Sequence, residues 1–261
     1  MELLSLNVTE FYSFFLTAIR VSLVVFLLPF FGAGTIPNPV KGAFCVVLSL
    51  ALWPRLSFPG TMLPQDTLGL ILMICGELVL GLILDILIHF LFSAVMMGGH
   101  MIGFSMGFSM MNVLDPMSGT QDSVTAQFMY QCSLLIFLAL NGHLFLLTGL
   151  AESFQLVPPG GLFITPSLAD SILVFAGSLF TLAIKISAPV LASLFLVDLA
   201  LALVSRAAPQ MNVIQIGFPL KIGVGFLFMT LTLTALAHYV GDYIADLGPM
   251  YTAVMNRPPV R

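Results

Sequence analysis

Apolar residues fill six long stretches of this chain, and short clusters of Gly, Pro and polar residues separate them. The stretches cover residues 11–31, 40–53, 67–97, 124–150, 171–205 and 213–240. We interpret all six as helices, because about 20 apolar residues at 1.5 Å per residue cross a bilayer. The second stretch is short for a span, whereas the third and fifth are longer than a span requires. The pattern predicts an all-α, integral-membrane-type protein with about six long, kinked helices.

Composition supports the membrane class and excludes others. The 261 residues are 59% hydrophobic and 8% charged, which is more apolar than a soluble domain needs. The formal net charge of −4 includes no basic block, so we expect no nucleic-acid partner. HExxH, GxSxG and GxGxxG motifs and metal-ligand spacings are absent from the sequence, so we expect no enzyme activity, metal or cofactor.

Seven ionisable side chains nevertheless interrupt the apolar stretches. They are Arg20, Glu77, Asp85, His89, Lys185, Asp198 and Lys221. A charge in the middle of a bilayer costs roughly 2.5 to 3.5 kcal/mol on insertion scales, so such residues face protein instead of lipid. They indicate either an internal polar pathway or partner subunits that complete the structure.

Polar residues form a stripe on two of the predicted helices, since steps of three and four residues return to one helix face. The stripes are Ser13, Thr17 and Arg20 in the first helix and Glu77, Gly81, Asp85 and His89 in the third. Arg20 is a candidate counter-ion for Glu77 or Asp85. The stripes fit a structural polar seam, a proton or ion relay, or a seam that faces another subunit.

The fifth stretch carries two ionisable residues that cannot pair with each other. Lys185 and Asp198 are thirteen residues apart, which separates them by about 20 Å along a helix. Each therefore needs its own partner, and Pro189 favours a kinked helix wrapped by neighbours.

A segment rich in Gly, Met and Phe over residues 99–123 is predicted to be a flexible apolar loop. Its candidate functional residues are Gly103, Phe104, Met106, Gly107, Phe108, Met110 and Met111. Such a surface can seal around varied cargo and repack when the cargo leaves. Glycines at 99, 103 and 107 could instead form a face for close helix packing.

Two proline-containing motifs predict a helical hairpin between the fifth and sixth helices. The chain reads Arg206-Ala-Ala-Pro209-Gln210-Met211-Asn212 and then Gly217-Phe218-Pro219-Leu220-Lys221. Pro209 lacks an amide donor and Pro219 restricts the residue before it, so we expect no helix here. The predicted hairpin tip comprises Arg206, Pro209, Gln210, Asn212, Pro219 and Lys221. Its two cations could also be solvated charges at a membrane surface.

With these two motifs, Gly76-Glu77 and the glycine-rich middle segment, the chain resembles the FliR/SctT family of type III secretion export-gate proteins over essentially its whole length. The resemblance implies one FliR-type domain over residues 1–261. Residues 1–165 would be similar to FliP and include the plug at 99–123. Residues 166–261 would be similar to FliQ and form a helical hairpin with a C-terminal tail, within a helical hetero-oligomeric pore.

The resemblance also implies a function. One such subunit would join FliP and FliQ in a closed pore for unfolded flagellar proteins, beside FlhB and FlhA, in the inner membrane at the flagellar basal body. Glu77, Asp85, His89, Lys185, Asp198 and Arg20 would then be buried polar or inter-subunit residues. A virulence secretion subunit of the same family and a proton-coupled secondary transporter remain alternatives, although no inverted repeat between the halves supports the transporter.

Overall fold

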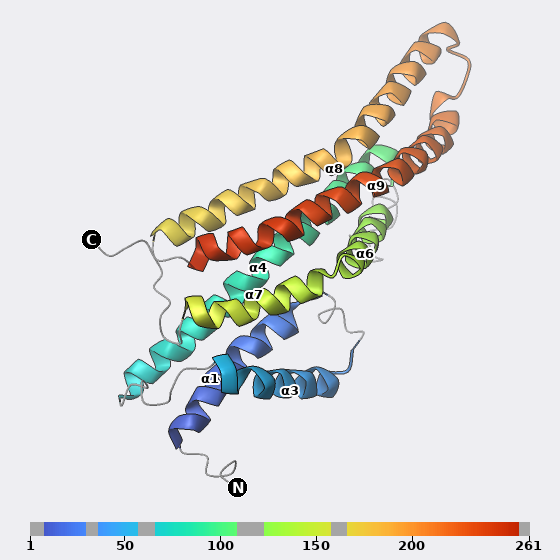
Figure 1. The fold of residues 1–261 in the computed structure, drawn as a ribbon. Coiled ribbons are helices and arrows are strands. Elements are labelled where there is room, and N and C mark those ends of the chain that lie inside the picture. Colours follow the sequence, from blue (N-terminus) through green and yellow to red (C-terminus); the bar gives the residue numbers. More distant parts are fainter. Residues whose placement is uncertain (1–7, 30–35, 57–65, 109–122, 158–165, 256–261) are drawn as a thin grey trace. The chain divides into compact units, whose positions relative to one another are not determined.

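A computed structural model describes residues 8–29, 36–56, 66–108, 123–157 and 166–255, and in these residues the chain is helical (Figure 1). The helices are α1 (Val8–Leu27), α3 (Asn38–Leu56), α4 (Thr67–Met106), α6 (Val124–Ala139), α7 (Gly142–Leu156), α8 (Pro166–Ala207) and α9 (Val213–Met255). The predicted all-α fold is confirmed.

Two predicted boundaries are wrong because apolar packing extends the helices past the glycines. We placed the end of the third helix at residue 97, but α4 continues to Met106, so residues 99–106 are helical and not a loop. We placed the end of the sixth helix at residue 240, but α9 continues to Met255. The segment between α4 and α6 is described only for Gly107, Phe108 and Ser123.

The fourth apolar stretch forms two helices where we predicted one. The amide of Leu140 donates to the carbonyl of Ile136 and ends α6. Asn141 then adopts a left-handed backbone conformation with φ of 58°, which Asn tolerates better than most residues. A helix cannot continue through that conformation, so α7 begins at Gly142.

Three helices are about twice as long as a bilayer core is thick. α4, α8 and α9 have 40, 42 and 43 residues, or about 60 Å each at 1.5 Å per residue. Among the described residues, four helices are long and apolar enough to cross a membrane, namely Glu10–Leu27, Thr67–Met106, Leu168–Ala207 and Gln215–Met255. Taking α6 and α7 as one broken span makes five. The protein is therefore a membrane protein.

The chain forms two compact units from interleaved segments. The first unit contains Met1–His89, Asn141–Phe175 and Ile244–Arg261, and the second contains Phe90–Leu140 and Ala176–Tyr243.

Close helix packing organises the first unit. Phe14 of α1 packs edge-to-face on Trp53 of α3, with ring centroids 5.9 Å apart. Gly81 of α4 faces Leu23 of α1, and a Cβ at Gly81 would lie 2.9 Å from the Cβ of Leu23. Gly81 therefore permits α1 and α4 to approach each other closely.

Tyr251 attaches the last turns of α9 to the first unit. Its ring covers Gly149 of α7, where a Cβ would lie 2.6 Å from the ring. Its hydroxyl donates a hydrogen bond of 3.3 Å to the carbonyl of Leu84 in α4. One buried aromatic side chain thus joins three helices.

The second unit has an apolar core where α4, α8 and α9 meet. The core contains Ile102, Met106, Val190 and Leu194, with Phe108, Ile222 and Phe228 packed against it. On another side of α4, Thr125 of α6 donates a 2.9 Å hydrogen bond to the carbonyl of Gly99. A Cβ at Gly99 would lie 2.5 Å from the Cα of Ala126, so this glycine does serve close helix packing.

Candidate functional sites in the two units

Arg20 and Glu77 form a buried ion pair at the centre of the first unit. Nε of Arg20 lies 2.6 Å from Oε2 of Glu77, and Nη2 lies 2.9 Å from Oε1. Both side chains are almost completely inaccessible to solvent. This two-point geometry is the strongest form of carboxylate recognition available to an arginine.

α7 supplies the remaining contacts of Arg20. Nη1 donates to Oγ of Ser153 at 3.3 Å, and Nη2 donates to the carbonyl of Val157 at 3.0 Å. The guanidinium also lies 4.3 Å from the ring centroid of Phe154. Val157 directly follows the last residue of α7, so Arg20 places a cation at the end of the helix where the dipole favours positive charge.

These contacts decide between two pairings that the sequence left open. Arg20 was a candidate counter-ion for Glu77 or Asp85, and it pairs with Glu77 within the chain. The polar stripes fit a structural seam, a proton or ion relay, or a seam that faces another subunit. The contacts of this pair with α1, α4 and α7 are those of a structural seam.

Asp85 and His89 form a second, more accessible pair one turn apart on α4. Nδ1 of His89 lies 3.0 Å from Oδ2 of Asp85, while the side chain of His89 is 45% exposed. Asp85 is buried, and its other carboxylate oxygen has no hydrogen-bond partner among the described residues. Arg20 therefore pairs with Glu77 and not with Asp85.

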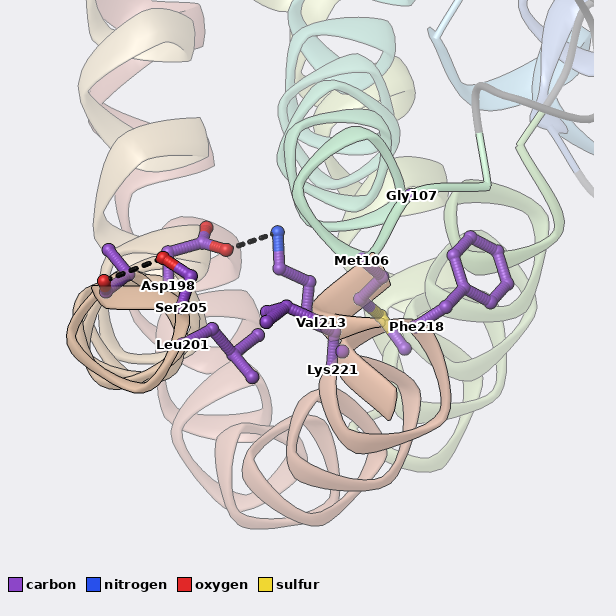
Figure 2. A pocket seen from close by; sticks show the side chains of 10 residues that line it. Met106, Gly107, Asp198, Leu201, Ser205, Val213, Phe218 and Lys221 are labelled. Atoms are coloured by element: carbon purple, nitrogen blue, oxygen red, sulfur yellow. Dashed lines mark hydrogen bonds and ion pairs between the residues drawn. The ribbon is translucent and has the colours of Figure 1, made fainter. Parts of the chain in front are cut away.

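The two ionisable residues of α8 lie at the surface of this chain, so their predicted contact with another subunit stays a prediction. Lys185 and Asp198 are both exposed. Asp198 pairs with Lys221 of α9 across the helical hairpin, as the dashed line in Figure 2 shows. Lys185 forms no ion pair with any other described residue.

The predicted hairpin between α8 and α9 is present, but its turn is shorter than we expected. Arg206 lies in the last turn of α8, and the turn between the helices contains Pro209, Gln210 and Asn212. Oδ1 of Asn212 accepts from the amide of Gln215 at 3.4 Å and caps the start of α9.

Pro219 and Lys221 were wrongly assigned to the tip. Both lie inside α9, where Pro219 leaves the carbonyl of Gln215 without its helical donor and yet does not end the helix. Lys221 is about two turns beyond the start of α9, and it pairs there with Asp198, which lies a similar distance before the end of α8.

A mostly apolar cavity of about 330 Å³ lies between this hairpin and the end of α4. Figure 2 shows Met106 and Phe218 on one side of it and the Asp198–Lys221 pair on another. The lining residues are Met106, Gly107, Asp198, Leu201, Ala202, Ser205, Val213, Gly217, Phe218 and Lys221. The cavity thus brings together residues from the predicted plug and from the predicted hairpin motifs.

Gly107 at this cavity occupies a conformation that demands glycine. Its φ is +93°, and a Cβ there would lie 2.9 Å from the ring of Phe218. Met106 is completely buried, whereas Phe104 is 72% exposed. Gly103 packs against Ser123 and Thr125. Met110 and Met111 lie outside the described residues.

Comparison with known proteins identifies the family. Residues 11–247 match the family described as "Bacterial export proteins, family 1". The chain belongs to this family. Its relatives include the "Flagellar biosynthetic protein FliR" of Bacillus subtilis, which is 34% identical over 87% of this chain and 88% of the relative. The "Flagellar biosynthetic protein FliR" of Escherichia coli is 29% identical over 95% of this chain and 94% of the relative. The "Surface presentation of antigens protein SpaR" of Salmonella typhimurium is 28% identical over 81% of this chain and 79% of the relative.

Membership makes this membrane protein an export protein and not an enzyme, and it confirms the resemblance drawn from the sequence motifs. The important residues that we did not predict in this family member are Phe218, Ser153 and Tyr251. Phe218 stands inside the Gly-Phe-Pro-Leu-Lys motif, which was a usable signal. Ser153 and Tyr251 lie in ordinary apolar sequence that gives no comparable signal.

Proposed function

We propose that this protein is the FliR-type subunit of a type III secretion export gate in the bacterial inner membrane. One copy would join FliP and FliQ in a closed pore through which unfolded proteins pass, with FlhA and FlhB as neighbours. Membership of the export family and the names of the relatives support this proposal. Residues 1–165 would correspond to the FliP-like part and residues 166–261 to the FliQ-like part.

The flagellar apparatus is the favoured setting. Two flagellar relatives are 34% and 29% identical to this chain, and the protein named for surface presentation of antigens is 28% identical. The margin is small, so a virulence secretion apparatus is the second candidate. The exported proteins would be flagellar components in the first case and virulence proteins in the second.

Within the gate, we assign the role of pore plug to residues 99–123, with the candidate residues lying between Gly103 and Met111. A conduit for varied polypeptides must deform around them and still stop ions at rest, and flexible apolar side chains meet both needs by repacking and dewetting. Phe104 is exposed and available for such contacts, whereas Met106 is anchored in the core.

The contact between Gly107 and Phe218 is the observation that carries the plug assignment. Gly107, the residue after α4, lies against Phe218 in the first turns of α9. The ring of Phe218 occupies the space where any residue other than glycine would place its Cβ. The plug is therefore in contact with the hairpin at Gly107. A change at this contact should alter the seal without removing a charge or an ion pair.

Two glycine substitutions test the assignment. In a strain lacking the native gene, Gly107→Ala should leave the gate leaky to small ions, measured as loss of membrane potential or as growth sensitivity to small solutes. Gly223→Ala is the matched control, because a Cβ at Gly223 meets nothing within 4 Å. The plug assignment is wrong if both variants accumulate normally, support motility and hold ions equally well.

A further inference from the structure

Lys185 is an exposed cation on an apolar part of α8. Its neighbours Phe180 and Ile184 are each 55% exposed, and Lys185 has no ion-pair partner among the described residues. The other ionisable residue within this helix behaves differently, since Asp198 is paired with Lys221. The second unit thus pairs one charge of α8, Asp198, and leaves the charge of Lys185 without a counter-ion among the described residues.

Lys185 belongs to a continuous exposed strip of the helix. At 100° per residue, Thr181, Lys185, Ala188 and Ala192 fall within about 60° of one another, and all four are exposed. We call these four residues the Lys185 strip. Its small side chains leave room for another helix to approach the backbone of α8 closely.

We propose that the Lys185 strip binds an apolar helix of another gate subunit, which places an Asp or Glu carboxylate against Lys185. The charge of Lys185 supports this proposal, because a cation on an apolar helix face needs a counter-ion. A carboxylate on a packed helix supplies the counter-ion and keeps both charges away from lipid. The inference rests on the proposed function and specifies the chemistry of the partner.

Two other occupants fit the strip less well. A second copy of this chain packed symmetrically on the strip would bring two Lys185 side chains together, and like charges in an apolar contact repel. An anionic phospholipid could supply a phosphate, but lipid tails gain nothing from the small residues that adjoin Lys185. A protein helix accounts for both the charge and the small side chains.

The experiment compares the yield of the gate complex after co-expression of the tagged chain with FliP and FliQ from the same organism. Lys185→Glu should lower the yield of co-purified FliP or FliQ by about tenfold or more, which corresponds to about 1.4 kcal/mol. Arg206→Glu is the control, because it makes the same charge reversal in the exposed last turn of the same helix. It should leave the yield within about twofold of the unchanged protein.

A second pair of variants tests the contact without changing charge. Ala192→Phe should block close approach to the strip and lower the yield, whereas Ala200→Phe should not, because Ala200 is also exposed but faces about 80° away from Ala192. Both positions are exposed, so neither substitution disturbs the packing within the chain.

Restoration identifies the carboxylate. With Lys185→Glu in place, each Asp or Glu inside an apolar helix of FliP and FliQ is changed to Lys in turn, and one such change should restore most of the yield. The inference is overturned if none of these changes restores the yield, or if Lys185→Glu assembles normally. Normal assembly together with loss of bound anionic phospholipid would show that Lys185 binds a lipid phosphate instead. Failure of the unchanged chain to co-purify would instead contradict the proposed function.

Discussion

Nε of Arg20 lies 2.6 Å from Oε2 of Glu77, and both side chains are buried where α1, α4 and α7 meet. A charged pair in this position stabilises the unit only while both partners are present. Removing one leaves the other charged, desolvated and unpaired, which is the costly arrangement. Loss of one partner should therefore cost the first unit more stability than loss of both.

Arg20→Met should destabilise the first unit strongly. Breaking a buried ion pair from one side costs about 3 to 5 kcal/mol, because the carboxylate of Glu77 would remain buried without its counter-ion. The measurement is the temperature at which the tagged chain, solubilised in detergent, aggregates. Arg206→Met is the control, since Arg206 is exposed, and it should leave that temperature unchanged.

The double variant Arg20→Met with Glu77→Leu distinguishes a structural pair from a functional one. If the pair serves only packing, replacing both charges by apolar groups should recover most of the lost stability, together with export. Recovery of stability without recovery of export would show that the charges act in transport. Equal destabilisation by the single and double variants would contradict the geometry described for this centre.

Asp198→Asn should have little effect on stability, in contrast to Arg20→Met. Its carboxylate is 51% exposed and pairs with a partly exposed Lys221, and such ion pairs contribute about 1 kcal/mol or less. The aggregation temperature in detergent should fall by no more than one or two degrees. A loss as large as that of Arg20→Met would mean that the hairpin arms depend on this pair.

Gly149→Ala should destabilise the protein by forcing the ring of Tyr251 off α7. A Cβ at Gly149 would lie 2.6 Å from that ring, and overpacking of this kind costs about 1 to 3 kcal/mol. Gly76→Ala is the control, because a Cβ there meets nothing within 4 Å. It should be neutral or raise stability by up to about 1 kcal/mol, since Ala favours a helix over Gly. Similar aggregation temperatures for the two variants would refute the packing of Tyr251.

The sequence predicts the helices and the identity of the family because both depend on local signals. Apolar stretches gave the all-α fold, and the motifs around Pro209 and Phe218 gave the resemblance that the comparisons confirm. Proline and glycine misled us about boundaries. α9 contains Pro219 and α4 continues past Gly99, because packing against neighbouring helices outweighs the cost of these residues.

Pairing of charges was harder to predict, because it depends on contacts between distant segments. A helix face can be read from spacing, so Arg20 was correctly considered opposite Glu77 or Asp85, but the spacing could not choose between them. Asp85 instead pairs with His89 on its own helix. The pairing of Asp198 with Lys221 depends on how α8 and α9 lie against each other in the hairpin, which spacing within one helix does not show.

The mass of the intact complex tests the central claim, that this protein works as one subunit of a heteromeric export gate. The tagged chain is co-expressed with FliP and FliQ, purified in mild detergent and weighed by native mass spectrometry. We expect a single assembly that contains one copy of this chain with several copies of the other two proteins. A stable species made of this chain alone, unchanged by the presence of FliP and FliQ and sufficient for transport, would contradict the account.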